Sequence, residues 1–213
     1  MPFATRVRSV LLPTTLVLLM SFPMICPCAA TVVTFDDLHE TASGSFIASP
    51  YQGLVWSNFA SLNAVLSPTL YGTDGAYYGM VSASNVTVNG SFLGSDYAEI
   101  DSSGTKFNFL SVYLTGEQRS NLNIEVQGFS GTNLLYDQTV VASATNPTLF
   151  PFNYLNIDRL RFNSFGGETA FFFGQENFVM DDLALQFIPE PSSLMLTFAG
   201  AVLLWPLLKR RRA

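Results

Sequence analysis

The sequence predicts an all-β domain, an antiparallel β-sandwich, between two end segments of different composition. Apolar and polar residues alternate with a period of two along many short stretches, and no apolar stripe with helical spacing is evident. Clusters of Gly, Asn, Ser and Asp, such as SGTNL and TGEQRSN, interrupt these stretches about every ten residues. Many short strands at this spacing are typical of a sandwich or barrel, and we expect a jelly-roll-like sandwich.

Each expected strand is a stretch of alternating or continuous apolar residues. In chain order these stretches are residues 31–35, 53–58, 85–88, 97–100, 107–114, 122–128, 133–141, 156–163 and 177–187. The clearest alternation is LNIEVQGF, in which Leu122, Ile124 and Val126 face the core and the polar residues between them face water. The chain's 19 Phe residues supply a large apolar area for such a core.

The first 30 residues are typical of a secretory signal peptide. A basic start precedes an apolar run from Val10 to Phe22, and small residues stand at Cys28 and Ala30, the −3 and −1 positions of a cleavage site. An uncleaved membrane helix fits less well, because Pro13 and Pro23 limit the apolar run. Cleavage after Ala30 would remove both cysteines, so the sandwich domain, residues 31–188, is expected to fold without disulfides.

Residues 189–213 form a second addressing segment. It starts with the motif Pro189, Glu190 and Pro191 and continues with an apolar segment, residues 192–208, expected to span the membrane as one helix. It ends with the basic residues Lys209, Arg210, Arg211 and Arg212. The positive-inside rule keeps this basic cluster in the cytoplasm and leaves the sandwich domain outside. A buried core helix is the alternative, but a core segment would not end in four cations.

This order of parts resembles the PEP-CTERM sorting signal of Gram-negative, biofilm-forming bacteria. The resemblance implies that Pro189, Glu190 and Pro191 are recognised by an exosortase-type membrane protease, which cuts near them. It also implies that the protein is anchored transiently in the inner membrane lipid and then passes to the cell surface or extracellular matrix. The two prolines keep the motif extended, which suits protease recognition.

The domain carries three short motifs, FDDL near its start, YQGLVW and a closing FVMDDLAL. Their layout resembles exported jelly-roll domains similar to galactose-binding-like and carbohydrate-binding modules. The resemblance implies association with exopolysaccharide. It further implies a structural Ca²⁺ held by acidic residues near both ends of the domain.

The net negative charge of the domain argues against nucleic acids as partners. Residues 31–188 contain four cations and fifteen carboxylates, a formal net charge of −11. A surface of this sign repels phosphate backbones, so we expect no nucleic-acid binding.

Two acidic pairs are the candidate calcium ligands. Asp36 and Asp37 lie in the first expected strand, and Asp181 and Asp182 lie in the last. Terminal strands can lie side by side in a jelly roll, and carboxylates are the oxygen ligands that Ca²⁺ prefers. Adjacent strand residues point to opposite faces, so at most one of each pair can reach a shared ion. Solvation and turn hydrogen bonds at strand ends are the alternative.

Aromatic residues gather between Ser49 and Met80. Tyr51, Tyr77 and Tyr78 are the candidate ligand-binding residues, since exposed rings can stack on sugar faces. Packing of these rings within the sandwich is the alternative.

Catalytic patterns are sparse. His39 is the single histidine, and it lies beside acids without the glycine pattern of a nucleophile elbow. Asp96, Glu99 and Asp101 form an acidic patch that could supply a glycosidase carboxylate pair.

The sequence therefore predicts a non-enzymatic exported surface or matrix protein that binds exopolysaccharide. A secreted carboxylate-dependent polysaccharide hydrolase and a purely structural matrix protein are the alternatives.

Overall fold

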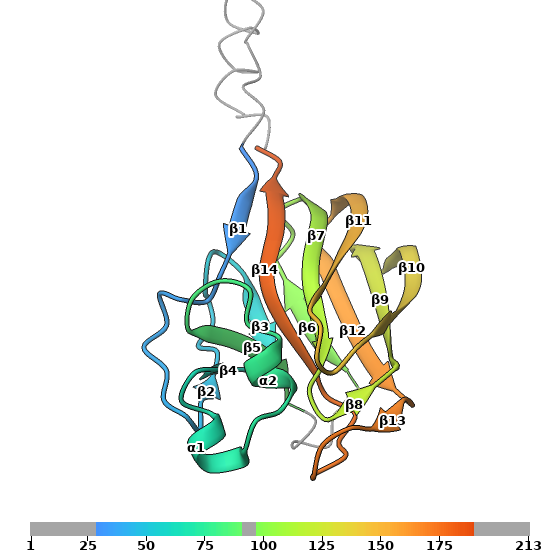
Figure 1. Cartoon of the computed structure of the whole chain (residues 1–213). Helices are drawn as coiled ribbons and strands as arrows, with labels where there is room; N and C mark the ends of the chain where they lie inside the picture. The colour runs from blue at the N-terminus through green and yellow to red at the C-terminus, as the bar shows by residue number, and fades with distance from the viewer. Residues whose placement is uncertain (1–28, 91–96, 190–213) are drawn as a thin grey trace, which may run out of the picture.

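The structure, a computed structural model, describes residues 29–90 and 97–189 of the chain. These residues form two antiparallel sheets that enclose one main hydrophobic core (Figure 1). The prediction of an all-β antiparallel sandwich is confirmed for this part of the chain.

The larger sheet contains seven strands. Their order is β11 (Thr148–Ile157), β7 (Phe107–Gly116), β14 (Phe178–Phe187), β5 (Asn85–Asn89), β4 (Phe59–Asn63) and β2 (Ser45–Phe46), and β1 (Thr31–Val33) also pairs with β14. The register of β1 on β14 aligns Thr31 with Leu185. The first and last strands therefore lie side by side, as expected from the sequence.

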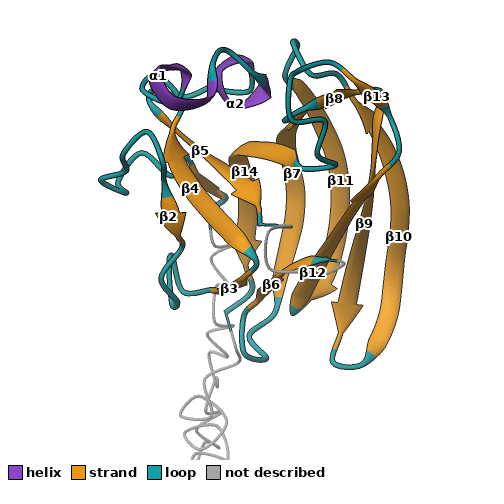
Figure 2. Cartoon of the chain, turned by 90° about the horizontal axis from the view of Figure 1, so that it is seen from below, coloured by secondary structure: helices purple, strands orange, loops and turns teal. Residues whose placement is uncertain are grey.

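The smaller sheet contains five strands. Their order is β10 (Asn133–Ala142), β9 (Leu122–Ser130), β12 (Arg159–Phe165), β6 (Ala98–Asp101) and β3 (Val55–Ser57). A short ribbon pairs β8 (Arg119–Ser120) with β13 (Glu168–Thr169), and two single-turn helices, α1 (Pro68–Tyr71) and α2 (Gly75–Tyr78), precede β5. Figures 1 and 2 show how the helices and this ribbon lie around the sheets.

The main core lies between the sheets and is rich in aromatic rings. Leu122, Ile124 and Val126 of β9 are fully buried, as their alternation predicts. Phe59 makes edge contacts with Phe162 at 5.9 Å and with Phe178 at 6.2 Å, which joins both sheets through ring packing.

A second, smaller apolar cluster lies apart from the main core. It is built on β4, β5 and β14 and includes Ala76 of α2. Its members are Leu62, Ala64, Ala76, Val86, Val88 and Val179. The helical segment thus packs on part of the larger sheet, a feature that period-two patterns do not predict.

Several strands differ from the sequence expectation. Strands β2, β4, β8 and β13 lie outside the expected stretches. The stretch expected as one strand over 156–163 is divided at Asp158, because β11 ends at Ile157 and β12 begins at Arg159. Strand β11 itself was not expected, since it contains Pro151. A proline cannot donate a ladder hydrogen bond and is tolerated on an edge strand, which is the position that β11 occupies.

The two ends of the described domain lie together at one end of the sandwich. Figure 1 shows the start of β1 beside the end of β14, while α1, β8 and β13 lie at the opposite end. Strand β14 has ten residues and runs along the sandwich, so about 30 Å separates this end of the sandwich from the opposite end.

Most residues of the addressing segments lie outside the described ranges. These are residues 1–28 of the expected signal peptide, Glu190, Pro191, the apolar segment 192–208 and the basic residues Lys209, Arg210, Arg211 and Arg212. Pro189 is described and exposed. Among the helices of residues 29–90 and 97–189, none has the length and apolar character needed to cross a membrane.

Candidate functional site

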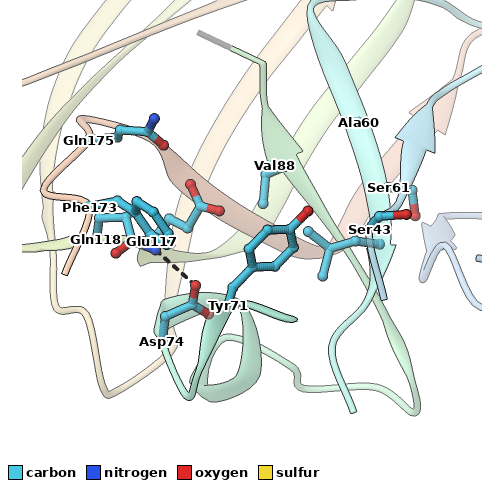
Figure 3. Close-up of a pocket in the computed structure, with 11 residues that line it drawn as sticks. Ser43, Ala60, Ser61, Tyr71, Asp74, Val88, Glu117, Gln118, Phe173 and Gln175 are labelled. Atoms are coloured by element: carbon cyan, nitrogen blue, oxygen red, sulfur yellow. Dashed lines mark hydrogen bonds between the residues drawn. The ribbon is translucent and has the colours of Figure 1, made fainter. Parts of the chain in front are cut away.

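A cavity of about 180 Å³ opens between the helical segment and the β8–β13 corner (Figure 3). We call it the end cleft. It is lined by Ser43, Ala60, Ser61, Leu62, Tyr71, Asp74, Val88, Glu117, Gln118, Phe173 and Gln175. Its volume corresponds to about six water molecules, which suits one sugar ring better than a long chain.

Exposed aromatic rings border the end cleft. Tyr71, the last residue of α1, is 44% exposed, and Phe173, in the loop after β13, is 52% exposed. The apolar part of the wall comes from Ala60 and Leu62 of β4 and Val88 of β5. An apolar wall with exposed rings and a few polar groups is typical of small-ligand sites.

Asp74 and Gln118 form the most rigid part of the polar wall. Asp74 caps α2, since its Oδ1 accepts a hydrogen bond from the Ala76 amide at 3.0 Å. Its Oδ2 accepts a hydrogen bond from Nε2 of Gln118 at 2.8 Å (Figure 3). Burial raises the pKa of Asp74, and these hydrogen bonds oppose that shift.

Glu117 is the second carboxylate of the end cleft. It follows directly after β7, is only 9% exposed and accepts a hydrogen bond from Nδ2 of Asn177 at 2.8 Å. Burial raises the pKa of Glu117 to about 7, and the negative charge of Asp74 contributes to the same shift. Figure 3 shows its carboxylate directed into the space between Tyr71 and Val88.

The close packing of α2 against the β7–β8 corner brings Asp74 and Glu117 together. The Gly75 amide donates a hydrogen bond to the Glu117 carbonyl oxygen at 2.8 Å. A Cβ atom at Gly75 would lie 1.9 Å from the Gly116 carbonyl oxygen, so only glycine permits this approach. The contact places the Asp74 cap beside the β7–β8 corner.

Sequence reasoning did not identify Asp74, Glu117 or Gln118. In the sequence, TGEQRSN has the composition of an exposed hairpin turn. Packing of α2 and of residues 173–177 against this turn buries it, and that packing joins segments about 40 and 60 residues apart. The adjacent Glu117 and Gln118 were the available signal, but turns are commonly polar.

Tyr51, a predicted ligand-binding residue, packs against the main core. Its ring stacks on Phe35 with centroids 6.1 Å apart, and its hydroxyl donates a hydrogen bond to Asp37. Burial and the Asp37 carboxylate raise the pKa of Tyr51. This residue does not line the end cleft.

Tyr77 and Tyr78, the other two predicted ligand-binding residues, are partly exposed on α2. Their rings contact each other edge-on at 5.7 Å, and Tyr78 stacks on Phe171 at 6.1 Å. They belong to the same end of the domain as the end cleft but are not part of its lining. Two of the three aromatic candidates, Tyr77 and Tyr78, thus lie on the helix that adjoins the cleft, and Tyr71 and Phe173 line it.

Three of the four predicted calcium ligands, Asp36, Asp37 and Asp181, accept hydrogen bonds from protein groups. Asp36 accepts a hydrogen bond from the Asn85 amide, and Asp37 accepts from Tyr51 and Gln52. Asp181 accepts from the Val81 and Ser82 amides, the Ser82 hydroxyl and the Asp182 amide.

Asp182 has a left-handed backbone with φ 48°, at a register shift between β14 and β7. Within residues 29–90 and 97–189, no group of three or more His, Cys, Asp and Glu side chains could hold a metal ion. This donor set does not fit a shared Ca²⁺, and Asp36 and Asp181 instead bind the backbone of the segment that leads into β5.

Two members of the acidic patch considered for catalysis, Glu99 and Asp101, lie on one face of β6, and each has protein partners. Glu99 pairs with Arg161 at 3.1 Å and lies 3.8 Å from Nε of Arg159. Asp101 accepts a hydrogen bond from the Ser103 amide, and Asp96 lies outside the described residues. The structure instead places Asp74 and Glu117 in one cavity.

No protein-family model matches the sequence, and no curated protein matches it. Among solved structures, the chain is similar to the K1 cleaved adhesin domain of Lys-gingipain from Porphyromonas gingivalis W83. That likeness has 11% identity and a TM-score of 0.41, over 76% of this chain and 99% of that one. It is also similar to TmCBM61, solved in complex with β-1,4-galactotriose, with 12% identity and a TM-score of 0.34, over 74% of this chain and 94% of that one. Likenesses this distant carry no assignment of function.

Proposed function

We propose that this chain is a non-enzymatic binding protein of the cell surface or extracellular matrix, and that its end cleft binds a sugar unit of an exopolysaccharide. The observation that carries the proposal is the pairing of exposed rings with buried polar groups in one small cavity. Tyr71 and Phe173 offer faces on which a sugar ring can stack, and Glu117 and Gln175 offer polar groups for its hydroxyls.

The position of the end cleft supports attachment at a surface. The domain's two described ends lie about 30 Å from the cleft, at the opposite end of β14 (Figure 1). A domain held by a membrane segment after Pro189 would therefore present its cleft away from the bilayer.

Export and sorting belong to the same proposal. The signal peptide and the PEP-CTERM-like tail would deliver the domain across the inner membrane, with an exosortase-type protease as the processing partner. The side-by-side ends of β1 and β14 suit this path, because leader and tail then extend from one end of the domain.

A glycan array probed with the full chain tests the binding proposal. The protein should be purified in a detergent without a sugar headgroup, since such a headgroup could occupy the cleft. We expect retention of at least one polysaccharide class, and we expect Phe173→Ala to weaken it by about tenfold, the effect of losing ~1.4 kcal/mol of ring contact.

The matched control is Phe165→Ala, which removes an exposed ring of β12 that does not line the cleft. Retention should be unchanged in this variant. A blank array, or equal losses in the two variants, would overturn binding at the end cleft.

A polysaccharide hydrolase is the second candidate, because two carboxylates share the cleft and the pKa of Glu117 suits a general acid. Each oxygen of Asp74, however, already accepts a hydrogen bond from a protein group, so Asp74 acts as the cap of α2 and is the weaker candidate for a second catalytic carboxylate. Incubation with each retained polysaccharide should release no reducing ends above the Glu117→Gln background. Release that depends on Glu117 would favour the hydrolase.

A further inference from the structure

The end cleft contains negative and hydrogen-bond-accepting groups but no cation. Asp74 and Glu117 are its charged residues, and no Lys, Arg or His lines it. In the described part of the chain, the ion pairs involve other carboxylates, and Arg119 next to Gln118 is directed to Gly174, Gly166 and Gly167. The two cleft carboxylates thus have no positive partner among the described residues.

The acceptor that the end cleft offers to a ligand is Glu117. Gln118 is 3% exposed, its Nε2 donates to Asp74, and its Oε1 is enclosed by the protein without a hydrogen-bond partner among the described residues. The Glu117 carboxylate accepts one hydrogen bond from Asn177 through Oε2, and Figure 3 shows it directed into the cavity. A carboxylate has about four acceptor positions, so a ligand can supply a further donor to Glu117.

Electrostatics narrows the nature of that donor. A buried carboxylate without a cation is costly, and protonation of the carboxylate relieves that cost in the free protein. The raised pKa of Glu117 reflects the cost of ionising a buried carboxylate beside Asp74. A ligand that brings a positive charge would stabilise the ionised carboxylate, whereas an anionic sugar would add repulsion.

We propose that the end cleft recognises the ammonium group of an amino sugar, with Glu117 as the ion-pair partner and Tyr71 and Phe173 as stacking surfaces. An ammonium group has three donors, which matches an acceptor-lined wall. The cavity volume of about 180 Å³ limits the recognised unit to about one ring. This inference rests on the proposed function, because it names the sugar class that the same cleft selects.

The test compares two oligosaccharides that differ at one group. A glucosamine hexamer carries free amines, and the N-acetylglucosamine hexamer of equal length carries neutral amides. Binding of each to the full chain is measured by calorimetry in the detergent used for the array. We expect the amine form to bind about tenfold more tightly, as one charge-assisted hydrogen bond predicts.

The variant Glu117→Gln tests the assigned partner. It keeps the side-chain shape and an oxygen that can accept from Asn177, so the fold should be retained, which a melting curve checks. We expect the preference for the amine form to fall to about one, while binding of the N-acetyl form changes less than about twofold.

The matched control is Glu168→Gln, which removes an exposed carboxylate of β13 outside the cleft. It reports the general attraction of an acidic domain for a cationic oligosaccharide, and the preference should persist in it. Equal affinity of the wild-type chain for the two hexamers, or an unchanged preference in Glu117→Gln, would overturn the inference and leave sugar binding intact. A blank array with no binding of either hexamer would overturn sugar binding and this inference together.

Discussion

Asp181 shows how one buried carboxylate acts as a structural acceptor. Its Oδ2 accepts the Val81 and Ser82 amides at 2.7 and 2.9 Å, and its Oδ1 accepts the Ser82 hydroxyl at 3.0 Å. Burial raises the pKa of Asp181 to about 6, and these hydrogen bonds oppose the shift. The residue therefore joins β14 to the segment before β5.

Replacement of this acceptor should be costly. We expect Asp181→Ala to lower the free energy of unfolding by about 3 kcal/mol, because two partly buried amides and one hydroxyl lose their partner. Urea unfolding of the full chain measures the change. The control Asp137→Ala removes an exposed carboxylate of β10 and should change stability by less than about 0.5 kcal/mol. Similar losses in both variants would contradict the assigned role.

Glu117 should make stability depend on pH in a definite direction. Its pKa in the fold is about 7, above the ordinary value of 4.5, so the folded state binds the proton more tightly than the unfolded state. Stability from this group is full below pH 4.5 and falls as the pH rises to 7. The expected loss is about 3 kcal/mol.

The variant Glu117→Gln isolates this contribution. The free energy of unfolding of the variant minus that of the wild type should rise by about 3 kcal/mol as the pH goes from 4.5 to 7. Contributions from Asp181 are the same in both proteins and cancel in this difference. Urea titrations across this range measure the difference. In Glu168→Gln the difference from wild type should stay constant. A constant difference for Glu117→Gln would show that its carboxylate is solvated.

At the scale of elements, helix α2 positions the polar wall of the end cleft. It has only four residues, so its own hydrogen bonds do not stabilise it in isolation. The Asp74 cap and the Gly75 contact with the β7–β8 corner hold it in place.

A side chain at Gly75 should displace α2. In Gly75→Ala the new Cβ would lie 1.9 Å from the Gly116 carbonyl oxygen, a backbone atom that cannot move away cheaply. We expect a lower melting temperature and loss of glycan retention on the array. The control is Gly90→Ala, whose Cβ meets the half-exposed Phe46 ring at 3.2 Å and requires only a small ring shift. An unchanged melting temperature in Gly75→Ala would contradict the close packing of α2 against the β7–β8 corner.

Strands show where sequence prediction succeeds at this scale. Alternation predicted β9 closely, because Leu122, Ile124 and Val126 each face one core. It failed for β11, whose Pro151 and left-handed Asn153 and Asn156 disturb the pattern. An edge strand tolerates these irregularities since one side of its ladder is unpaired, and edge position depends on the whole sheet.

At the scale of the whole molecule, the domain separates its attachment end from its cleft end. The β1–β14 pair brings the two described ends together (Figure 1). The cleft-lining residues Val88 and Glu117 lie beside the other end of β14, where Val88 pairs with Val179 and Gly116 pairs with Phe178. Cleavage near the Pro189 motif would then release or transfer the domain without disturbing the cleft.

The sorting proposal predicts a defined carboxyl terminus. In cells that contain an exosortase, mass spectrometry of the mature protein should show an amino terminus near Thr31 and a carboxyl terminus close to Pro189, Glu190 and Pro191. The replacement of both motif prolines by Ala should leave the tail attached, because the stretch could then become helical. A mature wild-type chain that still ends at Ala213 would contradict the proposal.

The all-β class, the inward faces of the clearest strands and the acidic character of the domain follow from local order in the chain. Period-two alternation, turn residues and charge counts are properties of neighbouring residues, so no knowledge of distant contacts is needed to see them. The addressing segments are likewise recognised from contiguous composition, and their function stays a prediction.

The end cleft depends on contacts between distant segments. The segment of Tyr71 and Asp74, the corner with Glu117 and the loop with Phe173 are far apart in the sequence. Only the packing of α2 and the loop after β13 against the β7–β8 corner brings them to one cavity. The same packing turns an ordinary polar turn into a buried carboxylate with a shifted pKa, because desolvation is a property of the assembled surroundings.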